Sequence, residues 1–440
     1  MSKKNVELFE KYSELQNLLL SMDDEPKINE VKNFIDDNNL WKNKNKTLST
    51  IRLIASIVLV KPNLLDNAVK LLNLYDSIDM YSYNDFFSLD RTADKEVIYR
   101  TQVILLLFIL SKHGSLIKEG KYGYYDSVFL KPVEFCKIDM YISFYDSQDI
   151  KKLSDEDKIK KRNQLHSINQ ISDLIRKDDL DGLQSFISKN NYDISLQIPR
   201  SLFEMHDILN NATPLEISAF YGSINCFKFL LNMSVKINYK RLLASSYAGG
   251  NYEIIHITEN QCQDEEIKKN IDCLHQSILY FHDDLIDYFV QNYSVKIDSE
   301  SYIKCIYASN YGAFLKLLQL DNSLAINEFG LIGSTPIDIA SFEGFLDFFK
   351  FLMSIEKVDP KKHNSFGKTV LQSAARSGKL YIVKYIIKHS LVDPNDKGEY
   401  GISAAQIARN YGWKKVFDFL KPISNPADLE EEEEEESGDD

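Results

Sequence analysis

Two groups of residues have types that could do chemistry, and neither has the required spacing. Gly367-Lys368-Thr369 matches the end of a phosphate-binding loop, but Lys362 occupies the position where that loop needs its first glycine. Structural zinc sites place two to four residues between paired ligands, whereas Cys273 and His275 have one between them. The other members of this histidine and cysteine group are His256, Cys262 and His282. We therefore expect structural histidines and cysteines, with no cofactor and no metal ligands.

The sequence also lacks the motifs of the common enzyme classes. No nucleophile elbow, zinc-protease, dinucleotide-binding or kinase motif occurs in it. Acid pairs such as Asp178-Asp179 and Asp283-Asp284 fall at expected helix starts, where the helix dipole favours negative charge. An enzyme would need its catalytic residues within 1–160, and nothing there forms a constellation. We predict that the protein is not an enzyme.

The charge of the chain is concentrated at its end. The net charge is −13, and ten negative charges lie in the last 13 residues, which contain no basic residue. The rest is nearly balanced, so no nucleic-acid partner is expected. The basic stretch 151–162 contains acidic residues as well and reads as a solvated helix. The acidic segment itself repels its own charges, which predicts a disordered tail at 423–440.

Cysteine usage and hydropathy indicate the compartment. Five scattered cysteines without a CxxC fit a reducing environment rather than a disulfide framework. The start, MSKKNVELFEKY, has no apolar core of a signal peptide. The most apolar run, Val103–Leu110, is shorter than the roughly 20 residues that span a bilayer. We expect a cytoplasmic protein without a membrane span, and nuclear localisation is not excluded.

Residues 335–344, TPIDIASFEG, read as a short helix with both ends marked. Thr335 can cap the free backbone N–H groups, and Pro336 suits the first helical position. Gly344 can adopt the positive φ that follows a helix end. A helix this short is marginal alone, so it needs a neighbour to pack against.

The same segment recurs along the chain. TVLQSAARSG ends at Gly378 and SAAQIARNYG at Gly412, each 34 residues after the preceding copy, and TPLEISAFYG ends at Gly222. Weaker copies lie between, so the closing positions are 222, 250, 282, 312, 344, 378 and 412. A second apolar-periodic segment follows each copy, and the connectors carry Pro, Asn, Asp and Gly. One unit is therefore a short helix, a tight turn, a longer helix and an extended connector.

This unit resembles the ankyrin repeat, which has about 33 residues, a β-turn and two helices. TPLEIS and TPIDIA are close to the family motif TPLHxA. The motif histidine is replaced by another polar residue in each copy: Glu216, Asp338, Gln372 and Gln406. The resemblance covers about residues 168–421 and is closest to divergent ankyrin proteins expanded in some protists. It implies an all-α solenoid of seven to eight units, several of them degenerate.

Residues 1–160 lack the period but have helical patterns. Ile28, Val31, Phe34 and Ile35 follow helical spacing, and further helices are expected at 48–60, 62–74 and 96–111. We expect this helical domain to cover the exposed first face of the repeat stack, because an uncapped end leaves apolar surface in water. The predicted domains are 1–160 (helical), 161–422 (repeat array) and 423–440 (acidic tail).

The resemblance also points to a binding face. In ankyrin-type repeats the two residues before the turn glycine lie on the concave side, and aromatic residues are frequent there in this chain. Tyr, Phe and Arg often anchor interfaces. The candidates are Phe220, Tyr221, Tyr280, Phe281, Tyr311, Phe342, Glu343, Arg376, Asn410 and Tyr411. Alternatively these aromatics fill gaps between repeats, and a partner contacts the finger turns around Lys361 and Asn395.

We predict a non-enzymatic scaffold that binds another protein on the concave face of the array. The alternative is an adaptor, whose N-terminal helical domain recruits an enzyme while the repeats select its substrate. An enzyme within residues 1–160 is the third reading. The sequence does not identify the partner or the oligomeric state.

Overall fold

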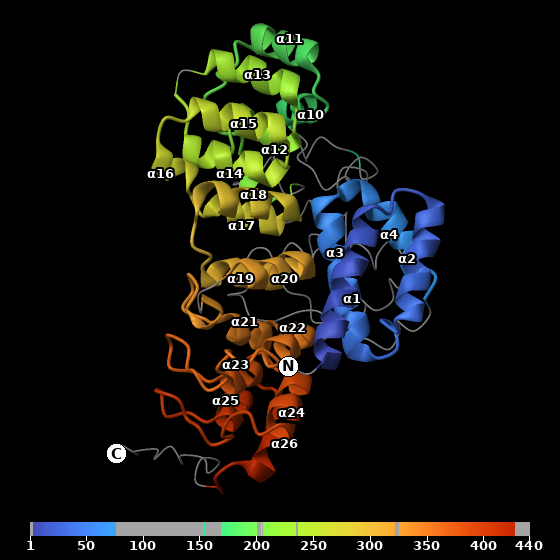
Figure 1. The fold of residues 1–440 in the computed structure, drawn as a ribbon, viewed down its shortest axis with the longest axis vertical. Helices are drawn as coiled ribbons and strands as arrows, with labels where there is room; N and C mark the ends of the chain where they lie inside the picture. Colours follow the sequence, from blue (N-terminus) through green and yellow to red (C-terminus); the bar gives the residue numbers. More distant parts are fainter. Residues whose placement is uncertain are drawn as a thin grey trace, which may run out of the picture. The chain divides into compact units, whose positions relative to one another are not determined.

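A computed structural model describes residues 3–75, 154, 169–199, 204, 206–234, 236–321 and 325–426 (Figure 1). The expected helix at 96–111 and nearly all of the basic stretch 151–162 lie outside these residues. So does the acidic segment from residue 427 onward. The expectations for these three segments, and the predicted domain boundaries, therefore stay predictions.

The described chain forms two compact units. The first, called here the N-terminal unit, contains the described residues within 10–297 and 307–321. The second, the C-terminal unit, contains residues 1–9, 298–306 and those from 323 onward. Two helices, α1 (Lys3–Leu20) and α19 (Ser299–Ala308), contribute residues to both units.

Apart from residues 3–9, the described head helices lie in the N-terminal unit, and helices are present at the expected segments 48–60 and 62–74. Asp24 caps α2 by accepting the N–H of Lys27 at 3.0 Å, and Asn43 caps α3 in the same way. The apolar stripe of α2 is buried at Ile28, Val31 and Ile35, as its spacing predicts. The head helices are α1 (Lys3–Leu20), α2 (Glu25–Asp37), α3 (Lys44–Val60), η1 (Pro62–Leu64) and α4 (Leu65–Leu72).

Helix pairs follow in the same unit. Helices α10, α12, α14 and α17 pack side by side as an inner row, and each packs on the outer helix that follows it. These helices are α10 (Gln170–Arg176), α11 (Leu180–Asn190), α12 (Pro214–Tyr221), α13 (Ile224–Met233), α14 (Tyr239–Gly249), α15 (Tyr252–Gln261), α17 (Asp272–Leu279), α18 (Asp283–Tyr293) and α20 (Tyr311–Leu320). Two short elements lie between them, η6 (Asp207–Leu209) and α16 (Glu265–Lys268).

The C-terminal unit continues the pattern. Its inner helices α21, α23 and α25 pack in a row, and each contacts its own outer helix. The elements are α19 (Ser299–Ala308), η7 (Ala325–Asn327), α21 (Pro336–Glu343), α22 (Leu346–Leu352), α23 (Val370–Arg376), α24 (Leu380–Lys388), α25 (Ala404–Asn410), α26 (Lys414–Leu420) and η8 (Lys421–Ile423). Across the described ranges no strand occurs beyond the isolated bridge Ile198–Ala212, which confirms the all-α class.

The residues that replace the motif histidine close capping boxes. In the four best copies the Thr or Ser side chain accepts from the third helical N–H, and the replacing side chain accepts the Thr or Ser N–H in return. Gln372 does more, because its Nε2 also donates to the carbonyl of Ile402 in the next repeat at 2.7 Å. Glutamine therefore supplies the contact between repeats for which histidine was missing.

The predicted turn positions are correct at five of the six glycines that close a copy. Gly378 has a φ of +71°, and Gly222, Gly250, Gly344 and Gly412 are also left-handed. Two degenerate copies differ from the prediction. The left-handed residues there are Phe281 and Ser309, so the turns fall one and three residues before the predicted closing positions 282 and 312.

The head contacts a helix other than the one expected. Within the N-terminal unit, α1 packs on α20, with the rings of Tyr12 and Tyr311 stacked at 4.8 Å between centroids. The expectation that the head covers the first repeat is thus wrong for the described part of the head. Within the C-terminal unit, Phe9 at the start of α1 stacks on Phe351 of α22 at 4.0 Å.

Candidate protein-binding face

The ten predicted binding residues differ widely in exposure. Two are exposed: Asn410 and Tyr411. Four are half-buried: Tyr221, Tyr280, Phe342 and Arg376. Four are buried: Phe220, Phe281, Tyr311 and Glu343. A buried side chain cannot contact a partner unless its own packing opens, so the candidate face contracts to the first six.

In the C-terminal unit the remaining candidates form one cluster. The guanidinium of Arg376 lies 5.6 Å from the ring centroid of Phe342 and 5.6 Å from that of Tyr411. The three residues come from the ends of α21, α23 and α25, so the cluster crosses three consecutive repeats. Trp413 donates its indole N–H to the Arg376 carbonyl at 2.8 Å and fixes the backbone beneath it. Cation–π contacts hold the guanidinium in place while Tyr411 keeps 52% of its surface exposed.

In the N-terminal unit the candidates pack mainly on each other. Phe220 meets Tyr280 edge to face at 5.2 Å, and the His206 ring stacks on Tyr280 at 5.8 Å. Tyr221 donates its hydroxyl to Glu204 at 3.3 Å. Burial raises the pKa of Tyr221 well above its usual value. These contacts make the cluster a packing element with only its rim exposed.

Tyr311 was placed wrongly by the repeat register. It is the first residue of the outer helix α20, not the end of an inner helix, and it is fully buried. Its N–H is accepted by the side chain of Gln16 at 2.9 Å. Phe281 is also displaced, because it occupies the left-handed turn position itself. Both side chains therefore serve packing.

A second exposed set was missed by the sequence analysis. Three apolar tip residues, Ile332, Phe366 and Tyr400, are 50%, 49% and 64% exposed. Each directly precedes a glycine of the 34-residue register, so the spacing in the sequence would have revealed them. They occupy the finger turns 330–334, 364–368 and 398–402, which precede α21, α23 and α25 (Figure 1).

Neighbouring fingers are tied together by their backbones. Ser365 donates its N–H to the Gly333 carbonyl at 2.8 Å, and Glu399 donates to the Gly367 carbonyl at 2.9 Å. Within the middle finger, the Asn364 side chain accepts from Phe366 and Lys368, both at 3.0 Å. The tips are therefore held in register rather than on loose loops.

Comparison with known proteins agrees with this repeat geometry. Residues 337–431 match the family model for ankyrin repeats, in three copies. The C-terminal part of the chain therefore consists of ankyrin repeats. Residues 231–317 match a model described as a domain of unknown function, DUF3447. A similar solved structure is the human ASB11 ankyrin repeat domain, at 15% identity and a TM-score of 0.29, with 59% of this chain and 99% of that chain covered. None of the curated proteins matches this sequence.

Two of the groups considered for chemistry have structural contacts. Gly367, Lys368 and Thr369 end a finger and begin α23, where Thr369 is the cap. His282 contacts the Ala248 carbonyl through Nε2 at 2.9 Å, and burial lowers its pKa. Over the ranges that the structure describes, no three His, Cys, Asp or Glu side chains gather as metal ligands. The described helices include none with the length and apolarity to cross a membrane.

Proposed function

We propose that this chain is a non-enzymatic scaffold whose partner protein binds the C-terminal unit at the tip residues and the Phe342–Arg376–Tyr411 cluster. Ankyrin repeats generally mediate protein–protein interaction. The single observation that carries the proposal is the row of tips Ile332, Phe366 and Tyr400, each about half exposed at the same place in consecutive repeats. Such apolar exposure is a common mark of an interaction surface.

The side chains on this face are of the types that often contribute most of the binding energy of a protein interface. Tyr and Arg are enriched among the residues that dominate measured interface energies, and the rings of Tyr and Phe bury large areas. Arg376 is already held between two rings, and the fingers are closed by hydrogen bonds. Less conformational entropy is then lost on binding, which favours affinity.

The described cysteines fit the proposed compartment. Cys226, Cys262, Cys273 and Cys305 are free and buried. Free cysteines fit a reducing environment, so we place the protein in the cytoplasm, with the nucleus as the second possibility.

The test compares full-length baits by quantitative affinity capture from the source cell. A Phe366→Ala/Tyr400→Ala bait should lose the principal captured protein by about thirtyfold, since two anchors that each contribute roughly 1 kcal/mol together contribute about 2 kcal/mol. A Leu196→Ala/Tyr252→Ala bait removes two exposed apolar side chains elsewhere (54% and 43% exposed) and should capture normally. Equal capture by all three baits would contradict the proposed face.

A further inference from the structure

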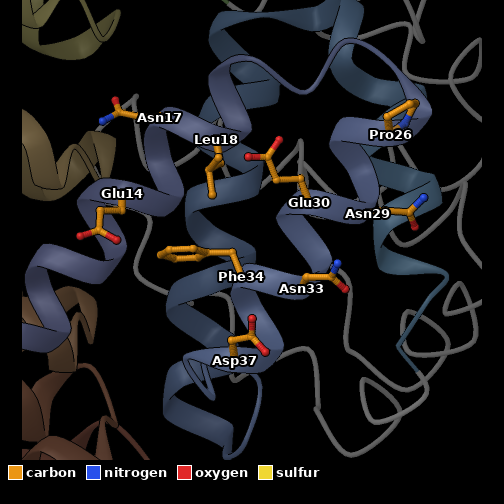
Figure 2. A pocket seen from close by; sticks show the side chains of 9 residues that line it. All are labelled: Glu14, Asn17, Leu18, Pro26, Asn29, Glu30, Asn33, Phe34 and Asp37. Atoms are coloured by element: carbon orange, nitrogen blue, oxygen red, sulfur yellow. The ribbon is translucent and has the colours of Figure 1, made fainter.

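A groove runs between the first two helices of the head, within the N-terminal unit (Figure 2). Its volume is about 770 Å³. Figure 2 shows Leu18 of α1 and Phe34 of α2 projecting into the space between the helices. Both side chains are half-buried, and they form an apolar floor.

The groove follows the whole length of α2. The residues of α2 that line it recur every three or four positions, from Pro26 to Asp37. This stripe is distinct from the core-facing stripe of Ile28, Val31 and Ile35. A helix of 13 residues is about 20 Å long, which matches three to four turns of a partner helix.

The rim of the groove is acidic. Its carboxylates are Glu14, Glu30 and Asp37, and no lysine or arginine is among the lining residues. These three side chains are exposed, and none forms an ion pair with a described residue.

Two carboxylates beside the groove are neutralised. Asp23 pairs with Lys27 at 2.7 Å, and Asp36 pairs with Lys32 at 2.6 Å. The groove therefore carries three negative charges without an ion-pair partner, on both sides of its apolar floor.

We propose that this groove binds an amphipathic α-helix of a partner protein, with apolar residues facing Leu18 and Phe34 and flanking lysines or arginines facing the three carboxylates. An apolar stripe seats on the floor in the manner of helix-in-groove recognition. The flanking cations then meet the acidic rim, and this complementarity sets orientation and encounter rate. A small molecule fits less well, because all lining residues except the two floor residues are exposed.

This surface is independent of the face proposed on the C-terminal unit. A binding groove on the head would supply the second interaction surface that an adaptor needs. Failure of one site leaves the other untouched, because the two share no residue.

The test uses the full chain and a fluorescent lysine–leucine amphipathic peptide of about 18 residues, long enough to form a helix. We expect saturable binding in fluorescence anisotropy, together with slower amide hydrogen exchange in α1 and α2. A Leu18→Ala/Phe34→Ala variant and a Glu14→Gln/Glu30→Gln/Asp37→Asn variant should each weaken binding about tenfold. A glutamate–leucine peptide with the same apolar face should not bind.

The matched control is Glu10→Gln/Glu25→Gln/Asp66→Asn, which removes three exposed carboxylates that do not line the groove. It should change binding by less than about twofold. Equal weakening by both triple variants would show general charge attraction and overturn the proposal. Absence of wild-type binding would overturn it too, as would a dimer that the Leu18→Ala/Phe34→Ala variant dissociates, since a second copy would then occupy the groove.

Discussion

Gln16 of α1 caps the start of α20, its Oε1 accepting the N–H of Tyr311 at 2.9 Å and that of Gly312 at 3.2 Å. Its Nε2 donates to Asn310 at 3.0 Å, so both ends of a fully buried amide are used. Helix N-termini carry unsatisfied N–H groups, and here a residue almost 300 positions earlier satisfies two of them.

Removing this amide should destabilise the protein. In Gln16→Ala the N–H groups of Tyr311 and Gly312 lose a partner in a buried site, which costs about 1–3 kcal/mol. Urea unfolding followed by circular dichroism measures the change. Asn17→Ala, which changes an exposed neighbour on the same helix, should stay within about 0.5 kcal/mol of wild type. Equal effects of the two variants would contradict the capping role.

The repeats themselves were predictable because their ends are marked locally. A Thr or Ser cap, a helical run and a glycine recur at a fixed spacing, and each is a short-range signal. The turn at Gly378 and the capping boxes follow from residues within ten positions of one another.

Other features depend on contacts that no local pattern reports. Asn310-Tyr311-Gly312 and Asn410-Tyr411-Gly412 are the same tripeptide, yet only Gly412 takes a left-handed φ. Asn310 instead caps α20 by accepting the N–H of Ala313 at 2.9 Å, so a helix begins where the register predicted a turn. The contact of α1 with α20 joins segments that are far apart in the sequence, and no local sequence pattern predicted it.

The binding face was partly readable. Ile332, Phe366 and Tyr400 share the period of the glycines that follow them, so the same register could have found them. The solvent exposure of the candidate aromatic side chains could not be predicted from the sequence, because an aromatic side chain at the end of an inner helix can face solvent or a neighbouring repeat. The groove on the head depends on which side of α2 meets α1, and that is set by tertiary packing.

Gly378 allows a separate test of the turn. It has a φ of +71°, and a Cβ there would lie 2.5 Å from the indole of Trp413. Gly412 has a φ of +75°, but a Cβ there would meet nothing within 4 Å. Gly412→Ala should therefore cost about 1–2 kcal/mol from backbone strain alone. Gly378→Ala should cost clearly more, because Trp413 must also move, and Gly378→Val should be at least as severe.

Thermal unfolding of the two alanine variants measures this difference. A melting temperature lower for Gly378→Ala than for Gly412→Ala supports the stacked indole. Equal losses would mean that Trp413 moves aside without cost.

Asp338 gives a prediction for pH. The residue is buried, and burial raises the pKa of its carboxyl to about 6. The hydrogen bonds from Thr335 lower this pKa, but by less than burial raises it. The folded pKa thus exceeds the unfolded value of 3.8, so the folded state binds the proton more tightly. The stabilisation is fully present below about pH 4 and is lost as the pH rises through about 6.

Asp338→Asn removes this titration while its amide oxygen can still accept from Thr335. Relative to wild type, the variant should gain stability between about pH 4 and pH 7, by about 1–3 kcal/mol. Urea unfolding at both pH values measures it, and the comparison cancels the other carboxylates. A difference between the proteins that does not change with pH would show that Asp338 titrates normally.

The two tyrosines of the repeated Asn-Tyr-Gly tripeptide separate packing from binding. Tyr311 is fully buried against Tyr12, whereas Tyr411 is 52% exposed beside Arg376. Tyr311→Ala leaves a cavity and should cost about 3–5 kcal/mol of stability, with normal partner capture at a temperature where the variant is folded. Tyr411→Ala should change stability by less than about 1 kcal/mol, yet weaken capture by roughly 1–2 kcal/mol. Thermal melts paired with quantitative capture measure both effects. If Tyr411→Ala binds normally while Tyr311→Ala does not, the partner contacts the N-terminal unit and the proposed face is wrong.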